Sequence, residues 1–246
     1  MSRLRTVAVI PARYGSSRFP GKVLAQLAGK PMIQHVYERA RASIADDCLI
    51  AADDERVAAA VTAFGGRAVM TDPALPSGTD RICASLRGVE ADIVINVQGD
   101  EPLLPTSVIN ELIELMRRPE AFPMATVAVP GDRAALTSPN KVKVVTDASG
   151  RALYFSRSMI PFLREGGTDM PVYLHWGIYA YRRETLEKFV KLPTGKLENC
   201  EKLEQLRAME NGIPIQVLFS NLESVGVDTP EDLARAEAKL AAMKGA

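Results

Sequence analysis

The segment from Pro11 to Lys22 combines basic side chains with small residues in a way that suits a phosphate chain. It follows Thr6–Ile10, an apolar, β-branched run that is typical of a buried strand. Glycines and serines let backbone N–H groups approach phosphate oxygens, and fixed cations neutralise their charge. The segment therefore predicts a triphosphate site, although a solvated basic loop is the alternative. Its cations are Arg13, Arg18 and Lys22.

Two common phosphate-binding motifs do not fit this segment. A P-loop has four residues between its glycines and Ser or Thr after its lysine. Here Gly15 and Gly21 are separated by five residues, and Val23 follows Lys22. A GxGxxG motif is absent from the sequence. These counts argue against a P-loop ATPase and against a dinucleotide-dependent dehydrogenase.

Two further loops carry polar residues at the ends of predicted elements. Gln98–Pro102 follows the apolar run Asp92–Val97, and a carboxylate such as Asp100 at a strand end is a natural Mg²⁺ ligand. The alternative is an ordinary turn aspartate. Ser77–Arg81 precedes a predicted helix, where Thr79 could be only an N-cap and Arg81 only a surface residue.

Composition restricts the class of protein. Among 246 residues, Lys plus Arg and Asp plus Glu number 30 each, which gives no electrostatic footprint for nucleic acid or a membrane surface. The sequence contains no run of about 18 apolar residues and no recognisable signal peptide, so we expect a cytoplasmic protein. The cysteines form no CxxC pair, which argues against a zinc site or a redox dithiol; they are Cys48, Cys83 and Cys200.

Strand and helix patterns alternate through the first 130 residues. This alternation predicts an α/β fold with a mostly parallel sheet and helices on both of its faces. Ligands of such sheets bind beyond the carboxyl ends of the strands, which is where the loops after the first and fourth strands would lie. The predicted helices span residues 31–41, 53–64, 79–86, 106–117, 198–210 and 229–243, with Thr106 and Thr229 as expected N-caps.

The middle of the chain has a different pattern. Residues 141–146 and 152–156 alternate around a turn with Gly150 at its left-handed position, which predicts a β-hairpin. Trp176–Tyr181 predicts another strand. We therefore expect a core from 1–139, an inserted mixed α+β subdomain at 140–192, and a return to the core at 193–246 with a closing helix.

The chain resembles one known family in sequence blocks along nearly its whole length, from Ile10 to Leu233. The resemblance is to the 3-deoxy-manno-octulosonate (Kdo) cytidylyltransferases, also called CMP-Kdo synthetases. The opening block is shared more widely among sugar nucleotidyltransferases, whereas HxGIY and LEQLR are more specific. The blocks, in order, are IPARYGSSRFPGK, GKPMIQHV, SGTDR, NVQGDEP, YFSR, HWGIYAY, EKLEQLR and GVDTPEDL.

The resemblance implies roles for particular residues. The triphosphate would be held by Arg13, Arg18 and Lys22, and the nucleotide seated by Ser77, Gly78, Thr79 and Arg81. Mg²⁺ would be held by Asp100 and Asp228, which with Lys22 would form the catalytic centre. The acidic sugar would be bound by Gln98, Arg157, His175, Tyr179, Glu204 and Gln205.

Several of these residues also have an ordinary structural interpretation. Taken alone, His175 could be a satisfied buried histidine, and Arg157 could cap a strand end. Glu204 and Gln205 could occupy the solvated face of a helix, and Asp228 could merely begin the last helix. Sugar carboxylates nevertheless attract Arg and His donors, and sugar hydroxyls attract Glu and Gln.

The resemblance implies a reaction, a partner and an oligomeric state. The anomeric hydroxyl of Kdo would attack the α-phosphorus of CTP and release pyrophosphate, supplying activated sugar for bacterial lipopolysaccharide, with Mg²⁺ as cofactor and a homodimer as assembly. The segment between Pro161 and His175 is shorter than in many members, which leaves the acid open. The alternatives are a cytidylyltransferase for 8-amino-8-deoxy-Kdo or sialic acid, and a non-catalytic nucleotide sensor.

Overall fold

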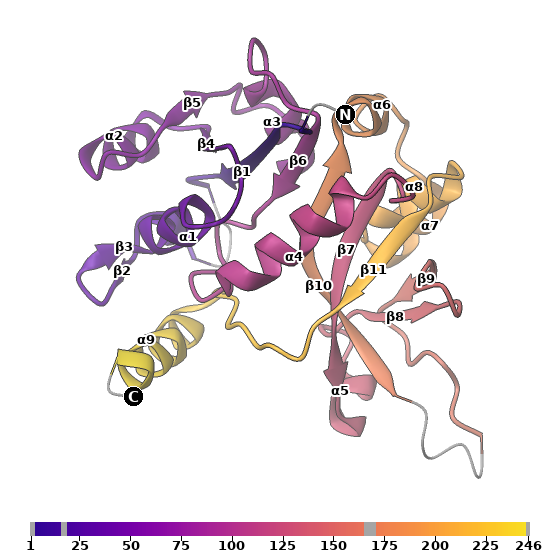
Figure 1. Ribbon diagram of the computed structural model, residues 1–246. Helices are drawn as coiled ribbons and strands as arrows, with labels where there is room; N and C mark the ends of the chain where they lie inside the picture. Colours follow the sequence, from indigo (N-terminus) through magenta and orange to yellow (C-terminus); the bar gives the residue numbers. More distant parts are fainter. Residues whose placement is uncertain (1–2, 16–18, 165–170, 245–246) are drawn as a thin grey trace. The chain divides into compact units, whose positions relative to one another are not determined.

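The structure is a computed structural model that describes residues 3–15, 19–164 and 171–244. The chain divides into two compact units. The first unit consists of Met1–Ile113 together with Glu223–Ala246, and the second of Glu114–Leu222. The first unit is therefore built from two segments that are far apart in the sequence, coloured indigo to magenta and yellow in Figure 1.

The first unit contains a parallel sheet in which β1 pairs with both β4 and β6, and β4 pairs with β5. Side chains of the central strands are fully buried, from Val7 to Ile10 and from Leu49 to Ala52, as expected for strands covered on both faces. The strands are β1 (Thr6–Ala12), β4 (Asp47–Ala52), β5 (Ala68–Met70) and β6 (Ile93–Asn96). The helices that pack against them are α1 (Met32–Arg41), α2 (Glu55–Ala63) and α3 (Gly78–Ser85).

The closing helix α9 (Pro230–Lys244) packs onto the beginning of the same unit. Its Ala236 and Leu240 share a hydrophobic cluster with Leu27, Met32 and Leu103. The hydroxyl of Thr229 accepts a hydrogen bond from the Asp232 N–H at 3.3 Å, so the predicted cap is confirmed. The short elements beneath α9 are the 3-10 turn η1 (Lys22–Leu24) and the antiparallel pair β2 (Gln26–Leu27) and β3 (Lys30–Pro31).

The second unit has a mixed sheet. β7 pairs in parallel with β11 and antiparallel with β10, while β8 pairs with β10 and β9. The strands are β7 (Met124–Gly131), β8 (Lys143–Thr146), β9 (Ala152–Ser156), β10 (Val172–Arg182) and β11 (Ile215–Phe219). The helices are α5 (Arg133–Thr137), α6 (Arg183–Phe189), α7 (Lys196–Glu201) and α8 (Gln205–Glu210), and α4 (Thr106–Arg117) leads from the first unit into the second (Figure 1).

The fold class predicted from the sequence is confirmed: the pairs β1–β4, β1–β6, β4–β5 and β7–β11 are parallel, and helices pack around the strands. The predicted hairpin is confirmed as β8 and β9, with Gly150 at a φ of +80°. The boundaries of the compact units differ from the expected 140 and 192, because β7 and β11 pair with each other beside β10.

Three local predictions are wrong. The N-cap of α3 is Ser77, whose side chain accepts the Asp80 N–H, and not Thr79. Because α4 begins at Thr106, this residue lies in the first turn and not at the cap, and its hydroxyl donates to the Arg39 carbonyl at 3.1 Å. The helix predicted over 198–210 is broken into α7 and α8 at Lys202, which is left-handed at φ 52°. Among the residues that the structure describes, no helix is long and apolar enough to cross a membrane.

Candidate functional site

Lys22 and two carboxylates form a compact charged group in the first unit. The Lys22 Nζ donates to Asp100 Oδ2 at 2.8 Å, to Asp228 Oδ1 at 2.9 Å and to the Val227 carbonyl at 3.1 Å. Burial alone would lower the pKa of Lys22, but the two carboxylates raise it above its ordinary value. Lys22 is therefore a fixed cation, and it brings together two aspartates from distant parts of the sequence.

Backbone contacts hold the two aspartates in place. The Val227 N–H donates to the Asp100 carbonyl at 2.8 Å, and Val227 itself lies in the hydrophobic cluster under α9. Asp232, in the first turn of α9, accepts the Asp228 N–H at 3.1 Å. Asp100 follows β6, as expected for a ligand-binding loop at a carboxyl end. The position of Asp228 thus depends on how α9 packs.

The donor set of this group fits Mg²⁺. Because both carboxylate oxygens contact one nitrogen, they lie within about 6 Å of each other, and small side-chain rotations would bring them to one ion. Within the described part of the chain, no cluster of three or more His, Cys, Asp or Glu side chains could hold a metal. Two carboxylates would leave positions for waters and phosphate oxygens, which is how Mg²⁺ usually binds.

Contacts with other parts of the first unit hold the beginning of the loop after β1. Asp53 Oδ1 accepts the Tyr14 N–H at 2.9 Å, and the Arg56 guanidinium lies 3.5 Å from the centre of the Tyr14 ring. The guanidinium of Arg13 donates to the Leu75 carbonyl at 2.7 Å. The predicted phosphate ligand Arg18 lies outside the described residues. Of the three predicted cations, the structure therefore places Arg13 and Lys22.

Arg81 is fully buried, so its interpretation as a surface residue is wrong. Its Nη1 donates to the Thr71 hydroxyl at 2.6 Å, and its Nη2 lies 3.5 Å from Asp53 Oδ2. No hydrogen-bond partner among the described residues is found for its Nε and Nη2. Arg81 is thus a buried cation that is paired with Asp53 and whose Nε lacks a hydrogen bond, which is unusual because buried polar groups are normally hydrogen-bonded.

Asp53 is a candidate site residue that the sequence analysis missed. Its carboxylate contacts both the Tyr14 N–H and the guanidinium of Arg81, so it joins two of the predicted nucleotide-binding segments. The signal was present, because Asp53 follows the apolar strand β4 as Asp100 follows β6. The remaining predicted residues of this unit are Gly78 and Thr79 in the first turn of α3, and Gln98, whose Nε2 donates to Asn96 Oδ1 at 3.1 Å.

In the second unit, His175 and Tyr179 lie together on β10. Their ring centres are 5.4 Å apart, and Phe155 meets His175 edge-on at 5.0 Å. Removal of the imidazole from water lowers the pKa of His175 to about 3. Burial, and next to it Tyr181 and Glu204, hold the pKa of Tyr179 well above its ordinary value. At neutral pH the pair thus presents an uncharged imidazole and a protonated phenol, with Glu204 nearby.

Arg157 is held by backbone carbonyls. Its Nε donates to the Glu201 carbonyl at 2.7 Å, and its Nη1 to the Pro139 carbonyl at 3.0 Å. The fully buried Lys143 donates to the Arg157 carbonyl and, at 2.7 Å, to the Lys141 carbonyl. Arg157 therefore fixes the end of α7. These contacts favour a structural role for Arg157 over a role in binding the sugar.

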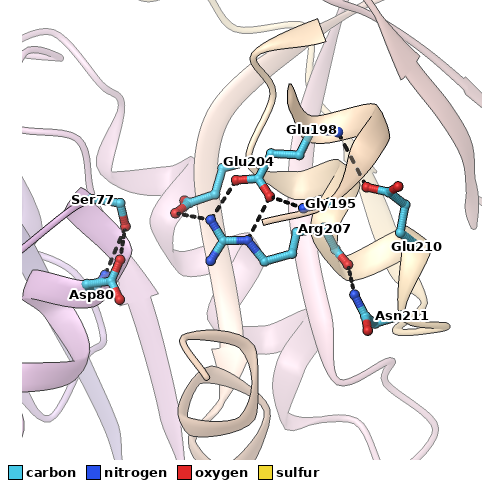
Figure 2. A network of polar contacts seen from close by, with 8 residues as sticks. All are labelled: Ser77, Asp80, Gly195, Glu198, Glu204, Arg207, Glu210 and Asn211. Atoms are coloured by element: carbon cyan, nitrogen blue, oxygen red, sulfur yellow. Dashed lines mark hydrogen bonds and ion pairs between the residues drawn. The ribbon is translucent and has the colours of Figure 1, made fainter. Parts of the chain in front are cut away.

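Glu204 and Gln205 begin α8, and a buried ion pair fixes that helix. Arg207 contacts Glu198 through two nitrogens, at 2.8 and 2.5 Å, and lies 3.7 Å from Glu204 (Figure 2). Gln205 is 4% exposed, so its placement on a solvated face is wrong. No hydrogen-bond partner among the described residues is found for its Nε2. This amide is the clearest unused donor of the second unit.

Comparison with known proteins gives a consistent result. The model of a family described as "Cytidylyltransferase" matches residues 7–217. A 3-deoxy-manno-octulosonate cytidylyltransferase of Syntrophobacter fumaroxidans is 52% identical over 236 residues, 94% of each chain. An 8-amino-3,8-dideoxy-manno-octulosonate cytidylyltransferase of Shewanella halifaxensis is 53% identical, covering 97% of this chain and 99% of the other. A solved CMP:2-keto-3-deoxy-manno-octonic acid synthetase in complex with CTP is 46% identical, with a TM-score of 0.93 over 97% of this chain and 99% of that one.

Proposed function

The chain belongs to the cytidylyltransferase family and is therefore a nucleotidyltransferase, and we propose that it transfers CMP from CTP to Kdo. The observation that carries the proposal is the contact of Lys22 with both Asp100 and Asp228. It joins the loop that suits phosphates to two carboxylates that suit Mg²⁺. The sequence similarity to a Kdo cytidylyltransferase supports Kdo as the acceptor.

The proposed reaction is a displacement at phosphorus. The anomeric hydroxyl oxygen of the sugar forms a bond to the α-phosphorus of CTP. The bond from that phosphorus to the oxygen bridging it to the β-phosphorus breaks, and pyrophosphate leaves. The hydroxyl proton passes to solvent, since no side chain is assigned as its base. Such transfers depend mainly on positioning and charge stabilisation.

Side chains of the first unit would supply that positioning. Arg13 and Lys22 would neutralise the triphosphate, and the buried Arg81 would add positive charge beside the nucleotide. Asp100 and Asp228 would hold Mg²⁺, which when bound neutralises phosphate charge and eases deprotonation of a nearby hydroxyl. In the second unit, Tyr179, Glu204 and Gln205 would bind sugar hydroxyls. Tyr179 would offer its phenol, Glu204 its carboxylate as an acceptor, and Gln205 its amide.

The choice of nucleotide gives the first test. We expect pyrophosphate release from CTP with Kdo to exceed that from UTP or ATP at equal concentration, because members of this family act on CTP. The measurement is coupled pyrophosphate release, with each nucleotide varied at saturating Kdo. Equal turnover of UTP would contradict the proposal, and CTP binding without any pyrophosphate release would instead support a nucleotide sensor.

The acceptor is tested in the same assay. Relatives of nearly equal identity carry the Kdo and the 8-amino-3,8-dideoxy names, so both acids are compared at fixed CTP, with sialic acid as a third. We expect the highest kcat/KM with Kdo. A higher kcat/KM with the 8-amino acid would make that acid the substrate in place of Kdo and would leave the proposed chemistry unchanged.

We also propose that the protein forms a homodimer through the segment 140–192. This segment exposes three large apolar side chains, Leu153 at 55%, Met159 at 40% and Phe162 at 78%. Light scattering at micromolar concentration should report twice the 26.7 kDa chain mass, and Phe162→Glu should lower the mass toward one chain. Met70→Glu, on an apolar residue of the first unit that is 50% exposed, is the matched control. A single-chain mass for the unaltered protein would contradict the dimer.

A further inference from the structure

The hydroxyl of Thr126 lies at the centre of three polar contacts. Its oxygen is 2.8 Å from the Ile178 carbonyl, 3.3 Å from the Trp176 carbonyl and 2.9 Å from His175 Nε2. Thr126 is fully buried on β7, so water does not compete for these contacts. The arrangement exists because the pairing of β7 with β10 shifts register between Trp176 and Tyr179, a bulge that turns the Ile178 carbonyl toward the hydroxyl.

One hydroxyl has one hydrogen, which decides the direction of these bonds. A carbonyl oxygen cannot donate, so the 2.8 Å contact with Ile178 uses the hydrogen of Thr126. The contact with His175 must then be a bond that the imidazole donates. His175 therefore carries its hydrogen on Nε2. The reverse assignment would leave two oxygens 2.8 Å apart with no hydrogen between them.

We propose that Thr126 is a positioning residue that fixes the tautomer of His175 and so leaves Nδ1 as a hydrogen-bond acceptor for a hydroxyl group of the acidic sugar. In the part of the chain that the structure describes, the hydrogen bond found for the His175 ring is made by Nε2 and not by Nδ1. The rings of Phe155 and Tyr179 flank the imidazole, and an apolar surrounding of this kind favours its uncharged form.

This inference corrects the role that the sequence suggested for His175. A neutral imidazole whose Nε2 hydrogen is already used has no second donor, so it cannot bind the sugar carboxylate as a cation would. It selects instead a group that carries a hydrogen. The low pKa of His175 is consistent with this assignment. The inference rests on the proposed function only in naming the sugar as the partner.

Nitrogen NMR of the imidazoles tests the tautomer of His175 without any change at Thr126 or His175. The protein has two histidines, and His35 Nε2 lies 2.7 Å from the Leu27 carbonyl, so it must also donate. His35→Gln removes that signal and assigns the other. We expect His175 at neutral pH to show a protonated Nε2 and an unprotonated Nδ1. Protonation of Nδ1, alone or together with Nε2, would overturn the proposal.

Two substitutions test the role of Thr126. Thr126→Val keeps the shape and removes the hydroxyl, whereas Thr126→Ser keeps it. Thr126→Val should raise the KM for the sugar roughly 2- to 12-fold, which corresponds to the loss of one ordinary hydrogen bond, and should leave the KM for CTP unchanged. Thr126→Ser should have the same KM values as the unaltered protein. In the Val variant, the Nε2 signal of His175 should also change. Equal effects of Val and Ser, or a KM for CTP that rises as much as that for the sugar, would refute the positioning role.

Titration with the sugar separates this inference from the proposed function. If the acid binds as stated, the Nδ1 signal of His175 shifts on its addition while that of His35 does not. If pyrophosphate is released with Kdo but Nδ1 does not respond, the function stands and the inference falls. If no acidic sugar supports pyrophosphate release, the proposed function fails, and the NMR tautomer still decides the role of Thr126.

Discussion

Asp100→Asn and Asp228→Asn should each lower kcat roughly 100-fold or more. Both changes keep the shape of the side chain and remove one negative charge from the pair that contacts Lys22. A metal that neutralises charge developing in the transition state is worth several kcal/mol, so the loss falls on turnover. Because both residues would act through one ion, the double variant should be about as slow as the slower single variant.

The Mg²⁺ dependence of pyrophosphate release separates a metal role from a role in holding Lys22. Both aspartate variants should need more Mg²⁺ for half-maximal activity. Lys22→Met should have a low kcat but should not need more Mg²⁺ for half-maximal activity, because removing a cation between two carboxylates favours a metal there. Glu223→Gln is the control, since this exposed carboxylate of the same C-terminal segment pairs with Lys239 and not with Lys22. Independent, multiplying losses in the double variant would argue against a shared ion.

Arg207→Met should destabilise the second unit by about 3–5 kcal/mol, because it leaves the buried carboxylate of Glu198 without its partner. Glu198→Gln combined with Arg207→Met should recover much of this loss, since no uncompensated charge remains. The protein has one tryptophan, Trp176 on β10, so its fluorescence during urea unfolding reports on this unit. Arg183→Met removes the partly exposed i,i+4 pair with Glu187 and should cost no more than about 1 kcal/mol.

The stability loss in Arg207→Met should depend on pH, and its direction follows from the pKa of Glu198. Burial would raise the pKa of Glu198, but Arg207 and the Gly195 N–H hold it below its ordinary value. In the unaltered protein, the contribution of Glu198 is therefore present above its unfolded pKa and lost as the pH falls through the lower folded pKa. In Arg207→Met, burial dominates and raises that pKa, so the penalty shrinks as the pH is lowered. A stability difference that does not narrow between pH 7 and pH 4 would contradict this account.

The parts that the sequence predicted correctly follow from local rules. Continuous apolar runs predicted the buried strands β1, β4 and β6, and the structure confirms that Asp100 follows one of them. Asp53 follows β4 in the same way, but an acidic pair before a helix also has a capping interpretation. Asp54 does cap α2, and this obscured the second role of its neighbour.

The remainder depends on contacts between distant residues. The break between α7 and α8 occurs at Lys202 without a glycine or proline. It is accompanied by hydrogen bonds from Arg157 to the Glu201 and Lys202 carbonyls, at 2.7 and 3.4 Å, from over forty positions away. The tautomer of His175 likewise depends on Thr126, a residue that no motif singles out, because the bulge in β10 is not visible in a one-dimensional pattern.

The two-segment construction of the first unit has a consequence for biosynthesis. When Ile113 leaves the ribosome, Lys22 and Asp100 have been made, but Asp228 has not. Residues 114–222 must be translated first, which takes roughly 5–20 s, and during this time Leu27, Met32 and Leu103 lack their partners on α9. A nascent or prematurely terminated chain that ends before residue 228 therefore contains the loop Pro11–Lys22 but lacks one of the two proposed metal ligands. Catalytic competence would then arise only late in translation.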